Sequence, residues 1–573
     1  MSTGLLHGAA RRGLLTIALS VLALAALSCT YTASARAAEP FFMTQTGGIY
    51  HYVRESDTTF ASIKAKIETG YYSSRGVRNL IFYCPYKATE DFRGVPAVDF
   101  FATNPNTGTV DDFGAMVTTA HAHGMAVIAY MGLLFFDPTS PIWIKAQKDH
   151  KAGTDSPEAN TFLWADDAEG DVADYGGWEY SDVAGSWFAT SWERPAIYLG
   201  TDDGKAFVKS VLKFWMDLGV DGFEYDSLES FWGVDFATLK EVLVTYPNSY
   251  SNGQKYLIRE GPLASFENAE ESDTIGLTHV LLSGDADDRS VATDVMNGEM
   301  SVDELEAHFV ANLDARRAKG RGAKAVSNYS DMSAAERALE AAVLAGSGAI
   351  MEIDYDEIYK LLDQQTQQQY DAVFVALARS TAEAPGASRK RVPTGTNKST
   401  YGIVRVSADG ASRAINLYNF SKQAAMLTVN LAGSGIEPGE VPTDLVTNKQ
   451  LAAVTGELSM SLPALGYALL AFGEIAEGGS EGTPLPTAGT GGSGMVPQGG
   501  KSPGTGGASN NGGATSAQGG DSTASGGDSE SVAANSDDSG CGCSTVPRSG
   551  GMLAAVAMAL AVGANLARRR RSN

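Results

Sequence analysis

The stretch Trp215-Met-Asp-Leu-Gly-Val-Asp-Gly-Phe-Glu-Tyr-Asp226 joins the end of an amphipathic helix to a short strand that finishes on a carboxylate. Apolar residues recur at helical spacing up to Leu218, and Gly219 ends the helix. Residues 221–226 then have the length and composition of a strand. Because side chains two apart on a strand share a face, Glu224 and Asp226 are expected to project together. An exposed acidic turn is the alternative interpretation.

Strand and helix patterns alternate on both sides of this stretch, which is typical of a parallel α/β fold. The number of predicted strands is eight, as a closed (β/α)8 barrel requires. Such a barrel carries its active site at the C-terminal ends of its strands. The strands are predicted at residues 48–53, 78–83, 126–131, 221–226, 255–260, 280–283, 324–330 and 349–354, and helices at 110–123, 205–218, 302–319 and 334–345.

The barrel is expected over residues 39–385, with an insert at about 137–204 after the third strand. β-rich runs bounded by Gly, Asn and Ser then predict a small antiparallel β-sandwich at 390–473. The predicted fold class is therefore α/β: a (β/α)8 TIM barrel with an insert, followed by a β-sandwich. The insert is rich in tryptophan and contains Trp164, Trp178, Trp187 and Trp192, with Trp143 at its start.

The two ends of the chain have the composition of targeting segments. Residues 1–38 have a basic start, an apolar run and small residues before position 38, which predicts a secretory signal peptide; a lipoprotein signal at Cys29 is the alternative. Residues 474–540 are dominated by small and polar residues and predict a disordered linker. Residues 541–573 hold two cysteines, a short apolar helix at 552–567 and a run of four arginines at 568–571.

That last arrangement resembles the C-terminal sorting signals of myxobacterial surface proteins, and a plain tail anchor is the alternative. We therefore expect export, with the barrel outside the cytoplasm at the cell surface or anchored to the membrane. The net charge of −24, from 67 acidic and 43 basic residues, excludes nucleic acid as a partner. Cys84 is the one cysteine of the globular part, so no disulfide framework is expected there. We expect a monomer with no cofactor.

The order of motifs resembles the α-amylase superfamily, glycoside hydrolase family 13, over roughly residues 45–473. Residues 221–226 stand where that family has Gly-Phe-Arg-x-Asp on its fourth strand. The other segments that carry the resemblance are residues 108–117 and 120–128 before the third strand, 255–261 at the fifth, 327–331 at the seventh and 342–358 at the eighth.

The resemblance implies a glycoside hydrolase or transglycosidase that acts on α-linked oligo- or polysaccharide with retention of configuration. This chemistry needs a carboxylate nucleophile and a carboxylic acid about 5 Å apart. The resemblance assigns Asp226 as the nucleophile and Glu260 as the general acid/base, whose pKa must be raised for it to stay protonated. A structural ion pair at the barrel rim is the alternative for each.

Glu224 departs from the family, because it stands where the family has an arginine beside the nucleophile. The negative charges of Glu224 and Asp226 are then expected to lie close together and to raise the pKa of one of these carboxyls, unless a cation neutralises them. Arg54 and Arg259 are the candidate cations. Glu224 and Asp226 form an acidic cluster with Glu352 and Asp354. This cluster suggests a cationic substrate such as an amino sugar.

The third and seventh strands depart from the family as well. On the seventh, Tyr329 and Ser330 replace a histidine and an aspartate, and Asp331 lies one residue further on. On the third, residues 130–135 lack the asparagine that often ligates calcium, so no metal is expected at that place. The candidate substrate-binding or supporting residues are Glu224, Asn328, Tyr329, Asp331, His51 and Trp192.

Two of these candidates have a plain structural alternative. His51 either contacts a sugar hydroxyl or is a core histidine whose ring nitrogens are satisfied by the protein. Trp192 and the other tryptophans of the insert either stack on sugars or form a local core. The alternative function is a catalytically inactive surface protein that binds glycans on the same barrel fold.

Overall fold

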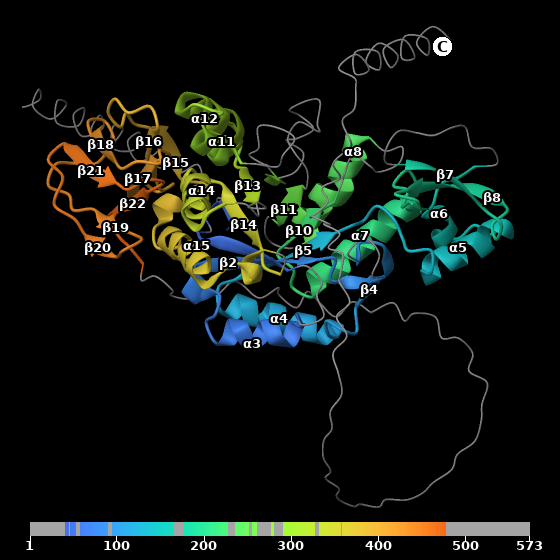
Figure 1. The fold of residues 1–573 in the computed structure, drawn as a ribbon. Coiled ribbons are helices and arrows are strands. Elements are labelled where there is room, and N and C mark those ends of the chain that lie inside the picture. Colours follow the sequence, from blue (N-terminus) through green and yellow to red (C-terminus); the bar gives the residue numbers. More distant parts are fainter. Residues whose placement is uncertain are drawn as a thin grey trace, which may run out of the picture. The chain divides into compact units, whose positions relative to one another are not determined.

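The computed structural model describes residues 41–44, 46–52, 58–89, 94–165, 176–226, 235–250, 255–259, 277–279, 290–326, 332–356 and 358–476. The chain divides into two units, Met1–Gly491 and Gly492–Asn573, and all the described residues belong to the first. Figure 1 shows their helices and strands coloured along the sequence.

Eight parallel strands close into a barrel at the centre of Figure 1. β1 pairs with both β2 and β14, and this double pairing closes the ring. The predicted (β/α)8 fold is thus confirmed. In barrel order the strands are β1 (Gly48–Tyr52), β2 (Val77–Tyr83), β5 (Ala126–Met131), β10 (Gly222–Tyr225), β11 (Tyr256–Arg259), β12 (Leu277–His279), β13 (Gly322–Val326) and β14 (Ile350–Asp354).

Helices join most of these strands, and side-chain caps begin them. Before α4, the Thr109 hydroxyl accepts from the Asp112 amide, and the Asp112 carboxylate accepts from the Thr109 amide, which satisfies two backbone donors at once. The helix expected at 302–319 is interrupted by a π-helical turn, Val310–Asp314. The helices are α2 (Phe41–Thr44), α3 (Phe60–Glu68), α4 (Val110–Ala122), α7 (Asp202–Asp217), α8 (Phe236–Leu239), α9 (Tyr246–Tyr250), α11 (Val291–Asn297), α12 (Val302–Phe309), α13 (Ala315–Arg317), α14 (Ala334–Gly346) and α15 (Gln364–Leu377).

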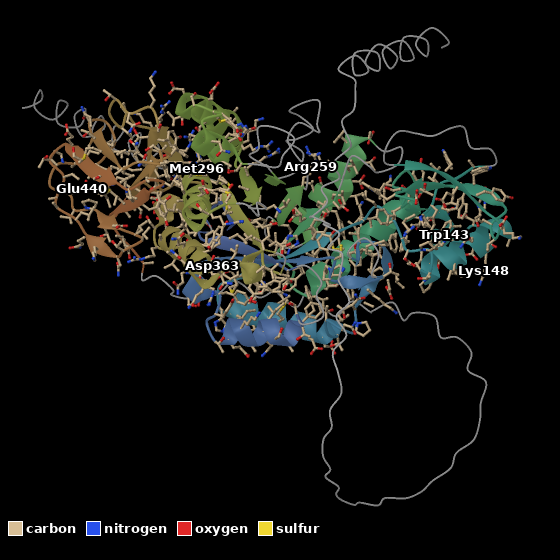
Figure 2. The ribbon with its side chains drawn as sticks, viewed as in Figure 1. Trp143, Lys148, Arg259, Met296, Asp363 and Glu440 are labelled. Carbon is tan, nitrogen blue, oxygen red and sulfur yellow. The ribbon has the colours of Figure 1, made fainter. Side chains whose placement is uncertain are left out.

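The insert follows the third barrel strand, as predicted. Its strands form an antiparallel sheet in which β8 pairs with β6, β7 and β9. Trp143, labelled in Figure 2, stacks on Trp164 with ring centroids 5.3 Å apart and also packs on Phe188, so these tryptophans form a local core. The elements are α5 (Pro141–Lys151), α6 (Pro157–Asn160), β6 (Trp164–Ala165), β7 (Gly176–Ser181), β8 (Ser186–Ser191) and β9 (Arg194–Pro195).

A strand pair between two barrel elements and the bounds of one barrel strand differ from those predicted. A short antiparallel pair, β3 (Tyr86–Ala88) and β4 (Ala97–Thr103), lies between β2 and α4 and was not predicted. The sixth barrel strand, β12, covers Leu277–His279, just before the predicted range 280–283, which lies outside the described residues.

Two antiparallel sheets follow the barrel, which confirms the β-sandwich. Apolar residues such as Ile415, Leu427 and Leu470 form their core. Tyr418 Oη and Asn416 Nδ2 donate to backbone carbonyls of α14, at 3.1 and 3.0 Å, which fixes the sandwich on the barrel. The strands are β15 (Ser388–Arg391), β16 (Thr400–Val406), β17 (Arg413–Asn419), β19 (Thr443–Asp444), β20 (Lys449–Gln450) and β22 (Tyr467–Phe472) in one sheet, and β18 (Ala425–Asn430) and β21 (Glu457–Leu462) in the other.

The helices of the described residues include none that is both long and apolar enough to cross a membrane. The predicted signal peptide at 1–38 and the sorting segment at 541–573, with its helix at 552–567, lie outside the described residues. So does the linker after residue 476. These segments therefore stay predictions.

Candidate active site

The strand that carries Asp226 is fixed by local sequence at both of its ends. Gly219 follows α7 with a φ of 98°, a left-handed conformation that favours glycine. At Gly222 a Cβ atom would lie 2.0 Å from the Tyr256 carbonyl oxygen, so β10 and β11 come together only with glycine there. Asp226 follows directly after β10, and its amide donates to the Met131 carbonyl at 3.3 Å.

Glu224 lies on the inward face of the barrel. It pairs in register with Tyr130 of β5 and Ile258 of β11, and only 1% of its surface is exposed. Its Oε1 atom meets Lys324 from β13, on the other side of the barrel, which requires an inward side chain. Strand alternation places Asp226 on the same face, one step nearer the C-terminal end, and Asp226 is partly exposed. The inward position of Glu224 is thus observed, and the shared face of Asp226 follows from strand alternation alone.

Lys324 joins two buried carboxylates. Its Nζ donates to Glu224 Oε1 at 2.5 Å and to Glu352 Oε2 at 2.6 Å. Burial alone would lower the pKa of Lys324, but Glu224 and Glu352 together raise it well above its usual range. Lys324 therefore stays protonated and supplies a fixed positive charge inside the barrel.

Glu224 keeps one oxygen without a partner. Within the described part of the chain, its Oε2 atom is buried and forms no hydrogen bond. Burial raises the pKa of Glu224, and the charge of Lys324 offsets only part of that rise. The carboxyl two residues before Asp226 is thus held by a lysine and costly to ionise without it.

His51 extends this network to β1. Its Nδ1 atom lies 3.1 Å from Glu352 Oε1, and its ring packs near Tyr83 and Tyr130, whose own centroids are 4.4 Å apart. Burial alone would lower the pKa of His51, but Glu352, then Glu224 and Asp354, raise it above its ordinary value. Nδ1 is satisfied by the protein, whereas Nε2 is buried and has no hydrogen-bond partner among the described residues, so the core-histidine alternative is met at one ring nitrogen only. A contact with sugar stays a prediction.

The raised pKa of His51 predicts a pH-dependent contribution to stability. A histidine whose pKa is raised in the folded state stabilises the fold while it is protonated, below about pH 6.5, and loses this effect as pH rises through the folded-state pKa. The unfolding free energy of the native protein minus that of His51→Gln is therefore expected to fall as pH increases. Urea denaturation of both proteins at several pH values measures this difference. A difference that is constant with pH, or grows, would contradict it.

Among the described residues, the cation that neutralises Glu224 is Lys324, which the sequence did not suggest. Arg259, labelled in Figure 2, pairs in register with Tyr225, whose hydroxyl donates outward to the Leu243 carbonyl at 2.8 Å. Arg259 therefore faces away from the barrel interior, on the opposite face to Glu224. Arg54 lies outside the described residues. Because Lys324 supplies the charge, the acidic cluster no longer argues for a cationic substrate.

Several predicted site residues lie outside the described residues: Glu260, Asn328, Tyr329 and Asp331. β11 ends at Arg259 and β13 at Val326, immediately before them. The separation of Asp226 and Glu260 therefore stays a prediction.

Trp192 is described and lies in the insert. With Glu193 it forms the two-residue turn between β8 and β9, and both residues have a positive φ, 52° and 58°. Such a φ is uncommon for residues other than glycine. Across the described ranges, no group of three His, Cys, Asp or Glu side chains is arranged to hold a metal ion. The expected lack of calcium at the third strand stays a prediction.

Comparison with known proteins identifies the class to which this fold belongs. No family model matches the chain. The cyclomaltodextrin glucanotransferase of Bacillus sp. (strain 1011) is 26% identical over 185 residues, 31% of this chain and 25% of that protein. Alpha-amylase 3 of Dictyoglomus thermophilum is 22% identical over 164 residues, 27% of this chain and 30% of that protein. The chain thus spans about a quarter of the length of the curated relatives it matches.

Solved structures cover more of the chain. Amy13B of Eubacterium rectale aligns with a TM-score of 0.58 at 15% identity, over 77% of this chain and 97% of that protein. The α-amylase from H. orenii aligns with a TM-score of 0.54 at 15% identity, over 75% and 99%. The chain therefore has the barrel fold of the α-amylase-type glycoside hydrolases and transglycosidases, as the resemblance predicted.

Proposed function

We propose that this chain is a glycoside hydrolase or transglycosidase of the α-amylase type, acting on α-linked oligo- or polysaccharide by a retaining mechanism. Asp226 is the nucleophile and Glu260 the general acid/base. The observation that carries the proposal is the position of Asp226, partly exposed at the C-terminal end of a barrel strand above a buried lysine. Active sites of this fold lie at that end of the barrel.

Two displacements at the anomeric carbon account for retention. Asp226 attacks this carbon while Glu260 gives a proton to the departing glycosidic oxygen, which leaves a glycosyl ester on Asp226. Glu260, now ionised, removes a proton from water, and the water displaces Asp226. When a sugar hydroxyl takes the place of water, the product is a new glycoside.

The stereochemistry of the products tests this mechanism. The full chain is incubated with maltoheptaose, soluble starch and isomaltotriose, and the first products are followed by proton NMR. We expect α-anomers to appear first and to mutarotate later. Hydrolysis that yields β-anomers first would contradict retention. If neither new reducing ends nor redistributed chain lengths appear with any substrate, the proposed activity is wrong for these α-glucans.

A second candidate function, glycan binding by the insert, has one observation in its favour. Tyr180 and Trp187 are register partners on β7 and β8, with ring centroids 5.6 Å apart, and Tyr180 is 52% exposed. Trp178, two residues before Tyr180, shares that face. Aromatic rings on a solvent-facing sheet suit the apolar faces of sugars.

Calorimetry with maltoheptaose tests this second candidate. Tyr180→Ala is expected to weaken binding about 3- to 10-fold, the range of one aromatic contact. Tyr250→Ala, which removes an exposed tyrosine of α9, is the control and should leave affinity unchanged. Equal affinity for all three proteins would exclude a role of this face in binding.

We also propose that the protein is exported and held at the cell surface or in the membrane, with the barrel outside the cytoplasm. Residues 1–38 and 541–573 support this by sequence alone. Protease added to intact cells should digest the barrel; full protection would contradict the proposal.

A further inference from the structure

The barrel interior below Asp226 contains buried charged side chains, which is unusual for a barrel of this kind. The interior of such a barrel is normally packed with layers of Val, Ile and Leu. Here Glu224, Lys324 and Glu352 occupy it, each no more than 3% exposed, and His51 is hydrogen-bonded to Glu352. The fold itself does not require charged groups at these positions.

A contribution to the stability of the fold does not explain these buried charges. Desolvation of buried ions is costly, and replacing a buried ion network with apolar residues of similar volume is often neutral or stabilising. Buried charges next to a partly exposed carboxylate at a barrel mouth are instead typical of functional sites. The network is therefore best explained by its effect on the neighbouring carboxylate.

We propose that Lys324 is a positioning residue for Asp226, which it keeps ionised by neutralising the buried carboxylates of Glu224 and Glu352. The inference rests on the proposed function for the nucleophilic role of Asp226. The effect of Lys324 on the ionisation of Asp226 can be measured whether or not the protein turns over a substrate.

The geometry explains how a lysine on another strand does this. Glu224 lies two residues before Asp226, about 6 to 7 Å along the strand. The family that the sequence resembles has an arginine at that position, whereas here the position is acidic and the cation reaches it from β13. With both carboxyls ionised, Glu224, Glu352 and Lys324 sum to one negative charge, and removal of the lysine would leave a sum of two. The added negative charge would make Asp226 harder to ionise and so raise its pKa.

The protonation of Asp226 can be measured without any substrate. A carbodiimide with glycinamide modifies protonated carboxyl groups, and peptide mass spectrometry of the full chain gives the labelled fraction of Asp226 against pH. Lys324→Met is expected to move the labelling midpoint of Asp226 up by about 1 pH unit or more. The exchange variant Glu224→Lys with Lys324→Glu keeps the same set of charges and should restore the midpoint to within about 0.5 unit.

Two further variants complete the test. Glu352→Gln removes a negative charge and should lower the midpoint, which keeps the inference falsifiable if Lys324→Met does not fold. Lys145→Met is the matched control, since Lys145 also bridges two carboxylates, Asp149 at 2.5 Å and Glu158 at 3.0 Å, but on the exposed surface of the insert. Lys145→Met should leave the labelling midpoint of Asp226 unchanged.

The outcomes separate this inference from the proposed function. An Asp226 midpoint that moves in neither Lys324→Met nor Glu352→Gln overturns the positioning role, even if the protein hydrolyses glycans. Midpoints that move as expected in a protein that turns over no glycan support the positioning role and count against the proposed function. When both hold, Lys324→Met should lower kcat at neutral pH at least about 10-fold with little change in KM, and the exchange variant should recover it.

Discussion

Asp226→Asn is expected to lower kcat for glycan hydrolysis about 10⁴-fold or more, because an amide cannot form the glycosyl ester on which the mechanism depends. Asparagine has nearly the same shape as aspartate, so the strand end should keep its structure. Substrate binding should survive, since the loss falls on a step after binding. Reducing-end release from maltoheptaose measures kcat, and calorimetry measures binding.

The control for this prediction is Asp182→Asn. Asp182 is exposed in the turn between β7 and β8, and its loss should leave kcat unchanged. An Asp226→Asn protein that keeps more than about a tenth of the native kcat would show that another group is the nucleophile. Asp354, which follows Glu352 on the inward face of β14, would then be the next candidate.

The position of Asp226 was predictable because its determinants are local. A helix with apolar spacing, a glycine that ends it and a short buried strand follow one another in sequence, and each has a pattern of its own. The third barrel strand was predicted with its observed bounds for the same reason. The orientation of Arg259 was also available from alternation, since Ile258 and Arg259 must face opposite sides of the barrel.

The role of Lys324 was not predictable in this way. Lys324 and Glu224 are a hundred positions apart, and their contact exists only because the barrel closes. The one signal was a lysine between two small residues, Ala323 and Ala325, at the start of a predicted barrel strand. Sequence pattern places such a lysine on a face, but the partner across the barrel depends on strand order and register.

Lys324→Met is expected to lower the free energy of unfolding by about 3 to 5 kcal/mol near pH 8, because it leaves Glu224 and Glu352 buried and ionised without a cation. Methionine fills most of the space of the lysine stem, so a cavity contributes little. The loss should shrink toward about pH 4, since protonation removes the uncompensated charge. Urea denaturation at both pH values measures it.

The reason for the loss can be separated from packing by one further variant. Lys324→Met combined with Glu224→Gln and Glu352→Gln retains the methionine but removes both charges, and it should recover most of the stability. Lys145→Met, with the same change at an exposed bridging lysine, should show no measurable loss. If the triple variant is no more stable than Lys324→Met, packing and not charge explains the loss. Lys324 would then be a structural residue, and Asp226 would depend on some other group for its charge.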